Sequence, residues 1–185
     1  MTRRRYLFDT PDRFVAGTVG EPGNRIFFLQ ARDGSRVISV ALEKVQIAAL
    51  IQRLDELLDE LERRGIEGAA TLDTFDADPA PLDEPINEAF RAGTLSLGWD
   101  TSDDLVLLEA REQTGEEEED DEDEADDDED GPDLLRVRIT ALAARAFVGR
   151  ALRVLSAGRP PCPLCGQPLD PQGHLCPRRN GHRLN

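Results

Sequence analysis

Three short blocks of this sequence occur twice, in the same order. Phe14–Thr18 returns as Phe90–Thr94, Leu29–Arg32 as Leu108–Arg111, and Arg36-Val37 with Ala41-Leu42 as Arg136-Val137 with Ala141-Leu142. The offsets between the copies are 76, 79 and 100 residues. Because the order is kept while the offset jumps by 21, we expect an insertion in the second copy. An internal duplication of this kind predicts that both halves of the chain fold alike.

The first copy has the pattern of three strands followed by a helix. We expect strands over residues 13–19, 25–31 and 37–42, separated by turns at 22–24 and at Asp33-Gly34. The helix that follows is amphipathic and ends near Gly65, which can adopt a left-handed cap. Its predicted apolar face contains Val45, Ile47, Ala48, Leu50, Ile51, Leu54, Leu57, Leu58 and Leu61.

The second copy shows the same pattern. We expect strands over residues 92–99, 105–111 and 134–140, and a helix over 141–156 that is stopped by Gly158 and the prolines after it. The core candidates on this helix are Leu142, Phe147, Ala151, Leu152 and Leu155.

These patterns predict an α+β protein in which two tandem βββα units share a core. A single three-stranded sheet with one helix is too thin to stand alone, so the units must pack together, in one sheet or in two facing sheets. The predicted segments are a first unit over 1–65, a connection over 66–85, a second unit over 86–158, and a C-terminal zinc-knuckle tail over 159–185.

The charge of the chain is concentrated in one acidic run. The sequence has 38 acidic and 22 basic residues, and residues 116–130 contain fourteen carboxylates and one alanine. We expect the surrounding loop, residues 113–133, to be solvated and disordered. The alternatives are a contact for a basic partner and an autoinhibitory strand mimic. No apolar stretch is long enough for a membrane helix and Met1–Arg5 do not begin a signal region, so we expect a cytoplasmic protein without a membrane partner.

All cysteines and histidines lie in the last part of the chain, between residues 162 and 182. Cys162 and Cys165 form a Cys-x2-Cys-Gly turn, which directs two sulfurs at one point. His174 and Cys176 are two residues apart, so on an extended segment they face the same side. We therefore expect a structural Zn²⁺ held by Cys162, Cys165, His174 and Cys176, with His182 as the alternative fourth ligand.

Other readings of the cysteines are a redox pair at Cys162 and Cys165, or three ordinary thiols in a frayed tail. The redox reading is disfavoured because prolines flank the pair instead of a strand and a helix. A disulfide is disfavoured because the cysteine count is odd. A short tail cannot bury a core of its own, so a metal is the natural source of its order.

The last third of the chain is rich in arginine. From Arg136 to Asn185 there are nine arginines and one acid, Asp170. These side chains suit a phosphate backbone, but the favoured interpretation is a solvated helix face, onto which the acidic run could fold back. The candidate anion-binding residues are Arg145, Arg150, Arg153, Arg178, Arg179 and Arg183.

No phosphate-binding or dinucleotide-binding glycine motif occurs in the sequence. Five aspartates could pair as general acid and base, although turn aspartates are far commoner than catalytic ones. They are Asp9, Asp12, Asp100, Asp103 and Asp104. The sequence thus favours a non-enzymatic protein.

The stretch from Cys162 to Gly181, with the Phe-x-Ala-Gly-Thr and Leu-x-Ala-Arg blocks, resembles an actinobacterial family, the domain of unknown function 3090 (DUF3090). The resemblance covers nearly the whole chain except the acidic insertion. It implies an actinobacterial cytoplasmic protein and no established activity, and it favours His174 over His182, since the latter position is often tyrosine in that family. Family members tend to lie beside genes for a phosphoglycerate-mutase-like phosphatase and a phosphoinositide-kinase-like protein.

The sequence therefore predicts a zinc-binding adaptor or interaction module for a protein partner. The alternatives are a nucleic-acid-binding regulator that uses the arginine-rich third of the chain, and an enzyme of phosphate or nucleotide metabolism.

Overall fold

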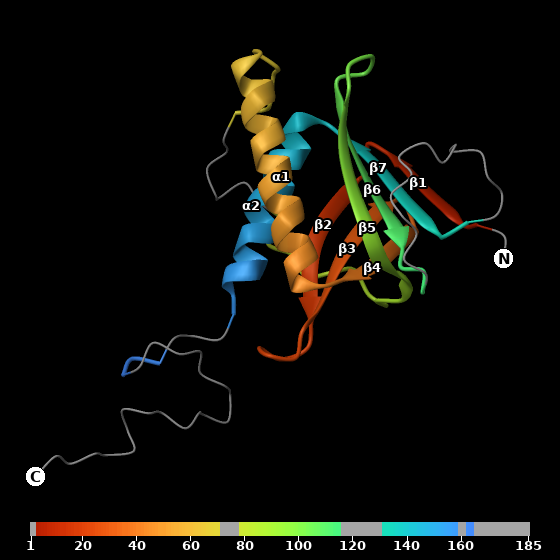
Figure 1. Cartoon of the computed structure of the whole chain (residues 1–185), viewed down its shortest axis with the longest axis vertical. Helices are drawn as coiled ribbons and strands as arrows, with labels where there is room; N and C mark the ends of the chain where they lie inside the picture. Colours follow the sequence, from red (N-terminus) through yellow and green to blue (C-terminus); the bar gives the residue numbers. More distant parts are fainter. Residues whose placement is uncertain (1–2, 71–77, 116–130, 159–161, 165–185) are drawn as a thin grey trace, which may run out of the picture.

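The computed structural model describes residues 3–70, 78–115, 131–158 and 162–164, and within them the chain forms one mixed sheet and two helices (Figure 1). The fold is α+β, and the sheet has seven strands. The elements are β1 (Arg5–Asp9), β2 (Arg13–Val19), β3 (Ile26–Asp33), β4 (Arg36–Leu42), α1 (Lys44–Arg63), β5 (Glu88–Asp100), β6 (Leu105–Glu112), β7 (Leu134–Ile139) and α2 (Ala141–Ser156). The strands and helices expected from the sequence occur near their predicted positions, and β1 was not predicted.

The strand order shows that the sheet is curled. It runs β1-β7-β6-β5-β4-β3-β2, so β1 and β2 lie at opposite edges, yet only residues 10–12 connect them. Four residue steps span at most ~14 Å, whereas the edges of a flat sheet of this width would be ~29 Å apart. The edges must therefore approach each other. The curl also brings β4 to β1, because the Arg36 guanidinium on β4 donates to the Leu7 carbonyl oxygen on β1 (3.1 Å).

One main core joins the sheet to both helices. The main cluster of buried apolar side chains has members from all seven strands and from both helices, which lie side by side on one face of the sheet (Figure 1). The ring of Phe14 on β2 stacks on that of Phe147 on α2, with 4.8 Å between ring centroids. The question of one sheet or two is thus answered by a single sheet with a continuous core.

Local signals set the ends of α1. The Ile66 N–H donates to the Leu61 carbonyl (3.0 Å) and the Gly65 N–H to the Glu62 carbonyl (2.9 Å), with Gly65 at a φ of +80°. This pair of bonds is the Schellman arrangement, and it confirms the glycine cap predicted from the sequence. At the other end, the Gln46 side-chain oxygen accepts from the Glu43 N–H (2.8 Å).

The predicted core face of α2 is partly wrong. Phe147 and Ala151 are buried, but Leu142 and Leu152 are 52% and 50% exposed. Arg145 and Arg150 are buried in their place, each less than 10% exposed. Periodicity assigned the arginines to solvent because it cannot anticipate that carboxylates and carbonyls elsewhere in the chain would bind them.

The opposite face of β2 to β4 is covered by the segment that precedes β5. Leu82 packs there in a small cluster with Val15, Phe28 and Ala41. A Cβ added to Gly17 would lie 2.5 Å from the Leu82 side chain, so the glycine makes this close approach possible. The predicted connection over 66–85 therefore contributes a second, smaller apolar layer.

The internal duplication stays a prediction. Three strands followed by a helix occur twice after β1, but corresponding residues have different neighbours: Phe14 pairs with Ala31 on β3, whereas Phe90 pairs with Val40 on β4.

Most of the predicted acidic loop lies outside the described residues. Backbone hydrogen bonds fix the described residues at its two ends. The Gln113 N–H donates to the Arg91 carbonyl, and the Glu112 N–H donates to the Asp133 carbonyl (both 2.8 Å).

Candidate functional site

The structure describes one of the predicted zinc ligands, Cys162. Its side chain is buried, and the N–H of Leu164 donates to its sulfur at 3.4 Å. An amide two residues on that faces the sulfur is what a Cys-x2-Cys turn provides for a metal-bound thiolate. Cys165, His174, Cys176 and His182 lie outside the described residues. Among the residues that are described, no three metal-binding side chains gather at one point.

Arg145, a predicted anion-binding residue, is bound inside the protein. Its guanidinium donates to the Ala69 carbonyl (2.5 Å) and to the carboxylates of Asp55 and Asp59 (both 2.6 Å). The side chain is 4% exposed. Arg145 therefore joins α2 to α1 and to the turn after α1, and its charge is already neutralised.

Arg150 is also bound internally. It donates to the Ala16 carbonyl on β2 (2.7 Å) and to the Asp78 carbonyl (2.6 Å), with the Asp78 carboxylate at 3.5 Å. Burial lowers the pKa of this guanidinium from its usual value. Arg153 is exposed and reaches the Asp78 carbonyl at 3.4 Å. The remaining predicted anion-binding residues, Arg178, Arg179 and Arg183, lie outside the described residues.

Arg13 fastens the segment 78–84, which we call the strap, to β2. Its guanidinium donates to the carboxylates of Asp78 (2.5 Å) and Asp83 (2.7 Å) and to the carbonyls of Ala80 and Pro81 (2.9 and 2.8 Å). The Arg13 side chain is only 9% exposed. Burial acts to raise the pKa of Asp78, but hydrogen bonds from Arg13 and the Ala80 amide outweigh it, so the net pKa lies below its usual value.

A polar pocket of about 760 Å³ lies between the strap and the strands β2 and β3. Its charged lining consists of Asp12, Arg13, Arg32, Asp78, Asp83 and Glu84. The Nε atom of Arg32 is buried and has no hydrogen-bond partner in the part of the chain that is described, with the Asp83 carboxylate 3.8 Å away. The pocket thus contains both signs of charge around one buried, unbonded donor.

Three of the five candidate catalytic aspartates meet at one arginine. Arg138 on β7 binds the carboxylates of Asp9 (3.1 Å), Asp100 (2.7 Å) and Asp103. The backbone N–H of Ser102, followed by Arg138, lowers the pKa of Asp100. A carboxylate held in its ionised form is a poor general acid, so this cluster is suited to fixing the β5–β6 turn.

The other two aspartates are turn residues. Asp12 accepts the Gly34 N–H at 2.8 Å, which ties the β1–β2 connection to the β3–β4 turn. Asp104 has a φ of +54° in the β5–β6 turn. Both positions suit the short polar side chain of aspartate without any catalytic role.

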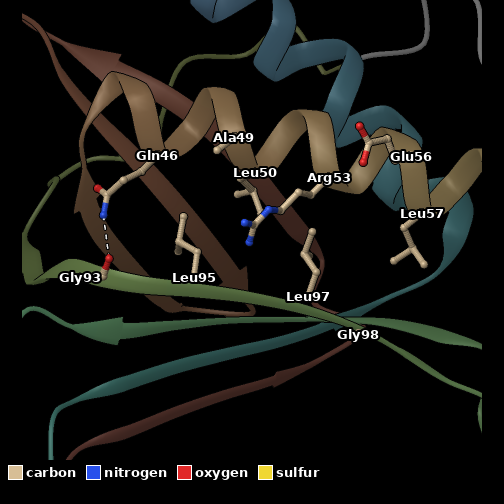
Figure 2. Close-up of a pocket in the computed structure, with 10 residues that line it drawn as sticks. All are labelled: Gln46, Ala49, Leu50, Arg53, Glu56, Leu57, Gly93, Leu95, Leu97 and Gly98. Carbon is tan, nitrogen blue, oxygen red and sulfur yellow. Dashed lines mark hydrogen bonds between the residues drawn. The ribbon is translucent and has the colours of Figure 1, made fainter. Parts of the chain in front are cut away.

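A second cavity, a groove of about 550 Å³, lies between α1 and β5 (Figure 2). Its walls are Gln46, Ala49, Leu50, Arg53, Glu56 and Leu57 from α1, and Gly93, Leu95, Leu97 and Gly98 from β5. Figure 2 shows Leu95 and Leu97 directed from β5 toward the helix. Four leucines therefore provide an apolar lining, with a small number of polar groups at its border.

Arg53 is the one cation of this lining, and it extends into the groove beside Leu50 (Figure 2). No carboxylate or carbonyl of the described residues binds its guanidinium within hydrogen-bond or ion-pair distance. Gln46 closes one end of the groove by donating to the carbonyls of Ala92 (3.0 Å) and Gly93 (2.9 Å). An apolar cavity with one unpaired cation and a fixed end has the character of a binding site.

Sequence reasoning missed this groove. Leu50 and Leu57 belong to the predicted apolar face of the helix and Arg53 does not, so each residue fits the ordinary pattern of an amphipathic helix. The length of β5 is the signal that was overlooked: the expected strand began at residue 92, while β5 begins at Glu88, pairs first with β4 and then continues past it.

Within the described residues, no helix has the length and apolar character needed to cross a membrane. The model of one protein family, described as "Protein of unknown function (DUF3090)", matches residues 6–176. A comparison with curated proteins found no match. A comparison with solved structures found none either.

Proposed function

Because the chain belongs to the DUF3090 family, whose description names no activity, we propose a function from its own geometry: a zinc-binding interaction module for a protein partner. The observation that carries the interaction role is the groove between α1 and β5, with its apolar lining and unpaired Arg53. Interfaces concentrate their energy in such concave apolar sites with few polar groups.

The zinc proposal concerns the C-terminal tail. Cys162, Cys165, His174 and Cys176 would hold the ion, and His182 is the alternative to His174. The residue that is described fits this role, because Cys162 is buried and its sulfur accepts the Leu164 amide. When bound, zinc supplies folding free energy to a segment too short to bury a core. The ion would have a structural role and the groove would bind the partner.

Metal analysis tests the zinc proposal. Full-length protein purified without chelator is expected to contain about one equivalent of zinc, as a four-ligand site requires. Cys162→Ser should lower this content. His174→Ala should lower it as well, whereas His182→Ala should leave it unchanged, and the reverse result would reassign the fourth ligand. Protein without stoichiometric zinc would contradict the proposal.

Photo-crosslinking tests the interaction role. A photoreactive amino acid at Ala49, inside the groove, is expected to yield a crosslink to a discrete protein in cells. The matched control carries the same amino acid at Ser35, in the exposed turn between β3 and β4. Equal crosslinking from both positions, or none from Ala49, would contradict a protein-binding role for the groove.

A second candidate, an enzyme of phosphate or nucleotide metabolism, is favoured by the polar pocket. The buried, unbonded Nε of Arg32 there is a donor that a phosphate oxygen would satisfy. Saturable stabilisation by inorganic phosphate or a nucleotide, lost in Arg32→Ala, would support this candidate. Its weakness is that Asp78 and Asp83 already bind Arg13 and so are not free to act as acid or base.

A further inference from the structure

Among the described residues, one edge of β5 has no neighbouring strand along the groove. β4 pairs with β5 only between Glu88 and Arg91. Beyond that point β5 continues to Asp100 with β6 as its only strand partner among the described residues. Figure 1 shows β5 running past the end of β4, alongside α1. The side of β5 away from β6 is therefore an open sheet edge that borders the groove.

The hydrogen bonds of β6 show which of its backbone groups face β5. The Glu112 N–H donates to the Asp133 carbonyl, toward β7, and the Gln113 N–H donates to the Arg91 carbonyl, toward β5. In a strand, the backbone groups of successive residues point to opposite neighbours. Glu109 and Arg111 therefore direct their N–H and C=O groups toward β5, as Gln113 does.

The register then identifies the open groups of β5. Arg111 pairs with Thr94 and Glu109 pairs with Ser96. The backbone of these two β5 residues is thus used by β6, and that of Leu95 and Leu97 points the other way, toward the groove. The Gln46 side chain donates to the carbonyls just before them, at Ala92 and Gly93. No described residue forms a hydrogen bond with the groove-facing backbone groups of Leu95 or Leu97.

We propose that the groove binds an extended peptide segment of the partner protein, which adds as a strand to β5 between Thr94 and Trp99. This inference rests on the proposed interaction function and specifies how the groove is used. A peptide backbone is the ligand that matches a row of alternating donors and acceptors, whereas a small apolar molecule would leave them unpaired. The available edge, six residues long, corresponds to a strand of roughly 17–20 Å.

The lining specifies the sequence of the segment. Every second side chain of the added strand would point to the α1 side, where it meets Leu50, Leu57, Leu95 and Leu97, so these positions should be apolar. Arg53 calls for one acidic residue close to them, because its guanidinium has no carboxylate of this chain among the described residues. The expected partner segment is thus extended, with alternating apolar residues and one carboxylate.

Selection from a displayed library of random twelve-residue peptides tests the proposal on the full-length, zinc-loaded protein. Enriched peptides are expected to share the alternating apolar pattern with an acidic residue. A scan of N-methylated amides along one such peptide should weaken binding about fivefold at every second position, because each lost backbone bond is worth ~1 kcal/mol. Binding insensitive to N-methylation, or no enrichment, would overturn strand addition.

A charge reversal at Arg53 tests whether the peptide binds in this groove. Arg53→Glu should weaken binding of the acidic peptide about tenfold, and changing the peptide's acid to lysine should restore it. Lys44→Glu, at the exposed start of the same helix, makes the same charge change outside the groove and should have little effect. Equal effects of the two variants would overturn the proposal. If peptide binding fails while the Ala49 crosslink to a cellular protein persists, the interaction function stands and strand addition is wrong.

Discussion

Among the described residues, β2 has one side without a strand neighbour, and so does β5 beyond Arg91. The two sides differ in how well other parts of the protein cover them. β2 is enclosed: α2 lies along it, Arg150 donates to its Ala16 carbonyl, and Arg13 binds the strap across its start. The guanidinium groups that close this edge belong to side chains that are 8% and 9% exposed.

The open side of β5 has much less protection. Gln46 satisfies only the carbonyls of Ala92 and Gly93, and α1 stands off from the rest of the strand with the groove between them. The contrast indicates separate tasks for the two edges. Substitutions at the β2 edge should lower stability, because they leave buried charges without partners. Substitutions at the β5 edge should weaken binding and leave stability nearly unchanged.

The largest loss of stability is expected from Arg13→Ala. It removes the bonds to Asp78, Asp83 and two carbonyls of the strap at once, and leaves two partly exposed carboxylates without this cation. Breaking a fully buried ion pair from one side costs about 3–5 kcal/mol. Because the two carboxylates are 35% and 29% exposed, we expect a smaller decrease, about 2–3 kcal/mol, in the free energy of unfolding, measured with urea. Arg13→Lys should recover only part, since lysine lacks the planar fork. A loss below ~1 kcal/mol would show that the strap does not close this edge.

Gly17→Ala should have the next largest effect. The added methyl would lie 2.5 Å from the Leu82 side chain and push the strap away from β2. Overpacking of this kind costs about 1–3 kcal/mol. Gly98→Ala, on β5, is the matched control, because its methyl would be 3.9 Å from the nearest side chain. Thermal unfolding of both variants measures the difference, and equal melting temperatures would contradict the assignment of Gly17 to a close contact.

Acid should loosen the β2 edge by a smaller amount. The pKa of Asp78 in the folded protein lies below its usual value of 3.8, so its ion pair with Arg13 contributes fully above that value. The contribution is lost as the pH falls through the folded pKa, below about 4. Because Asp78 is 35% exposed, we expect only about 1 kcal/mol. In urea titrations at pH 3 and pH 6, Asp78→Asn should reduce the difference in stability, and an unchanged difference would assign the acid sensitivity to other carboxylates.

The smallest change in stability is expected at the open edge. Arg53→Glu should alter the free energy of unfolding by no more than ~0.5 kcal/mol, because no described residue binds this side chain. Peptide or partner binding should nonetheless fall, which is the opposite of the behaviour of Arg13→Ala. A loss of several kcal/mol from Arg53→Glu would mean that Arg53 is a structural residue, and the contrast between the edges would fail.

The fold was predictable from the sequence where the pattern is local. Alternation and turn signals predicted β2 to β4, and the Gly65 cap of α1 was predicted correctly as well. β1 was missed because its pairing with β7 is set by residues more than a hundred positions away. The exposure of Leu142 and the burial of Arg145 were missed for the same reason, since the partners of Arg145 lie on α1 and in the turn after it.

The zinc site and the groove also differ in how far they can be predicted from local sequence. A metal site can be predicted from ligand spacing alone, and the sequence does so for Cys162 and its neighbours. The groove depends on where β4 stops relative to β5 and on how α1 is set above it, and neither follows from periodicity. Leu95 and Leu97 read as ordinary strand residues, so only the sheet register shows that their backbone groups face an open edge.

Amide hydrogen exchange of the free, full-length protein, followed residue by residue by NMR, shows whether the β5 edge is open. If the edge is open, the amides of Leu95 and Leu97 should exchange at least about a hundredfold faster than those of Ser96 and Gly98, which bond to β6. Slow exchange at all four positions would mean that the edge is already covered, and would contradict the account.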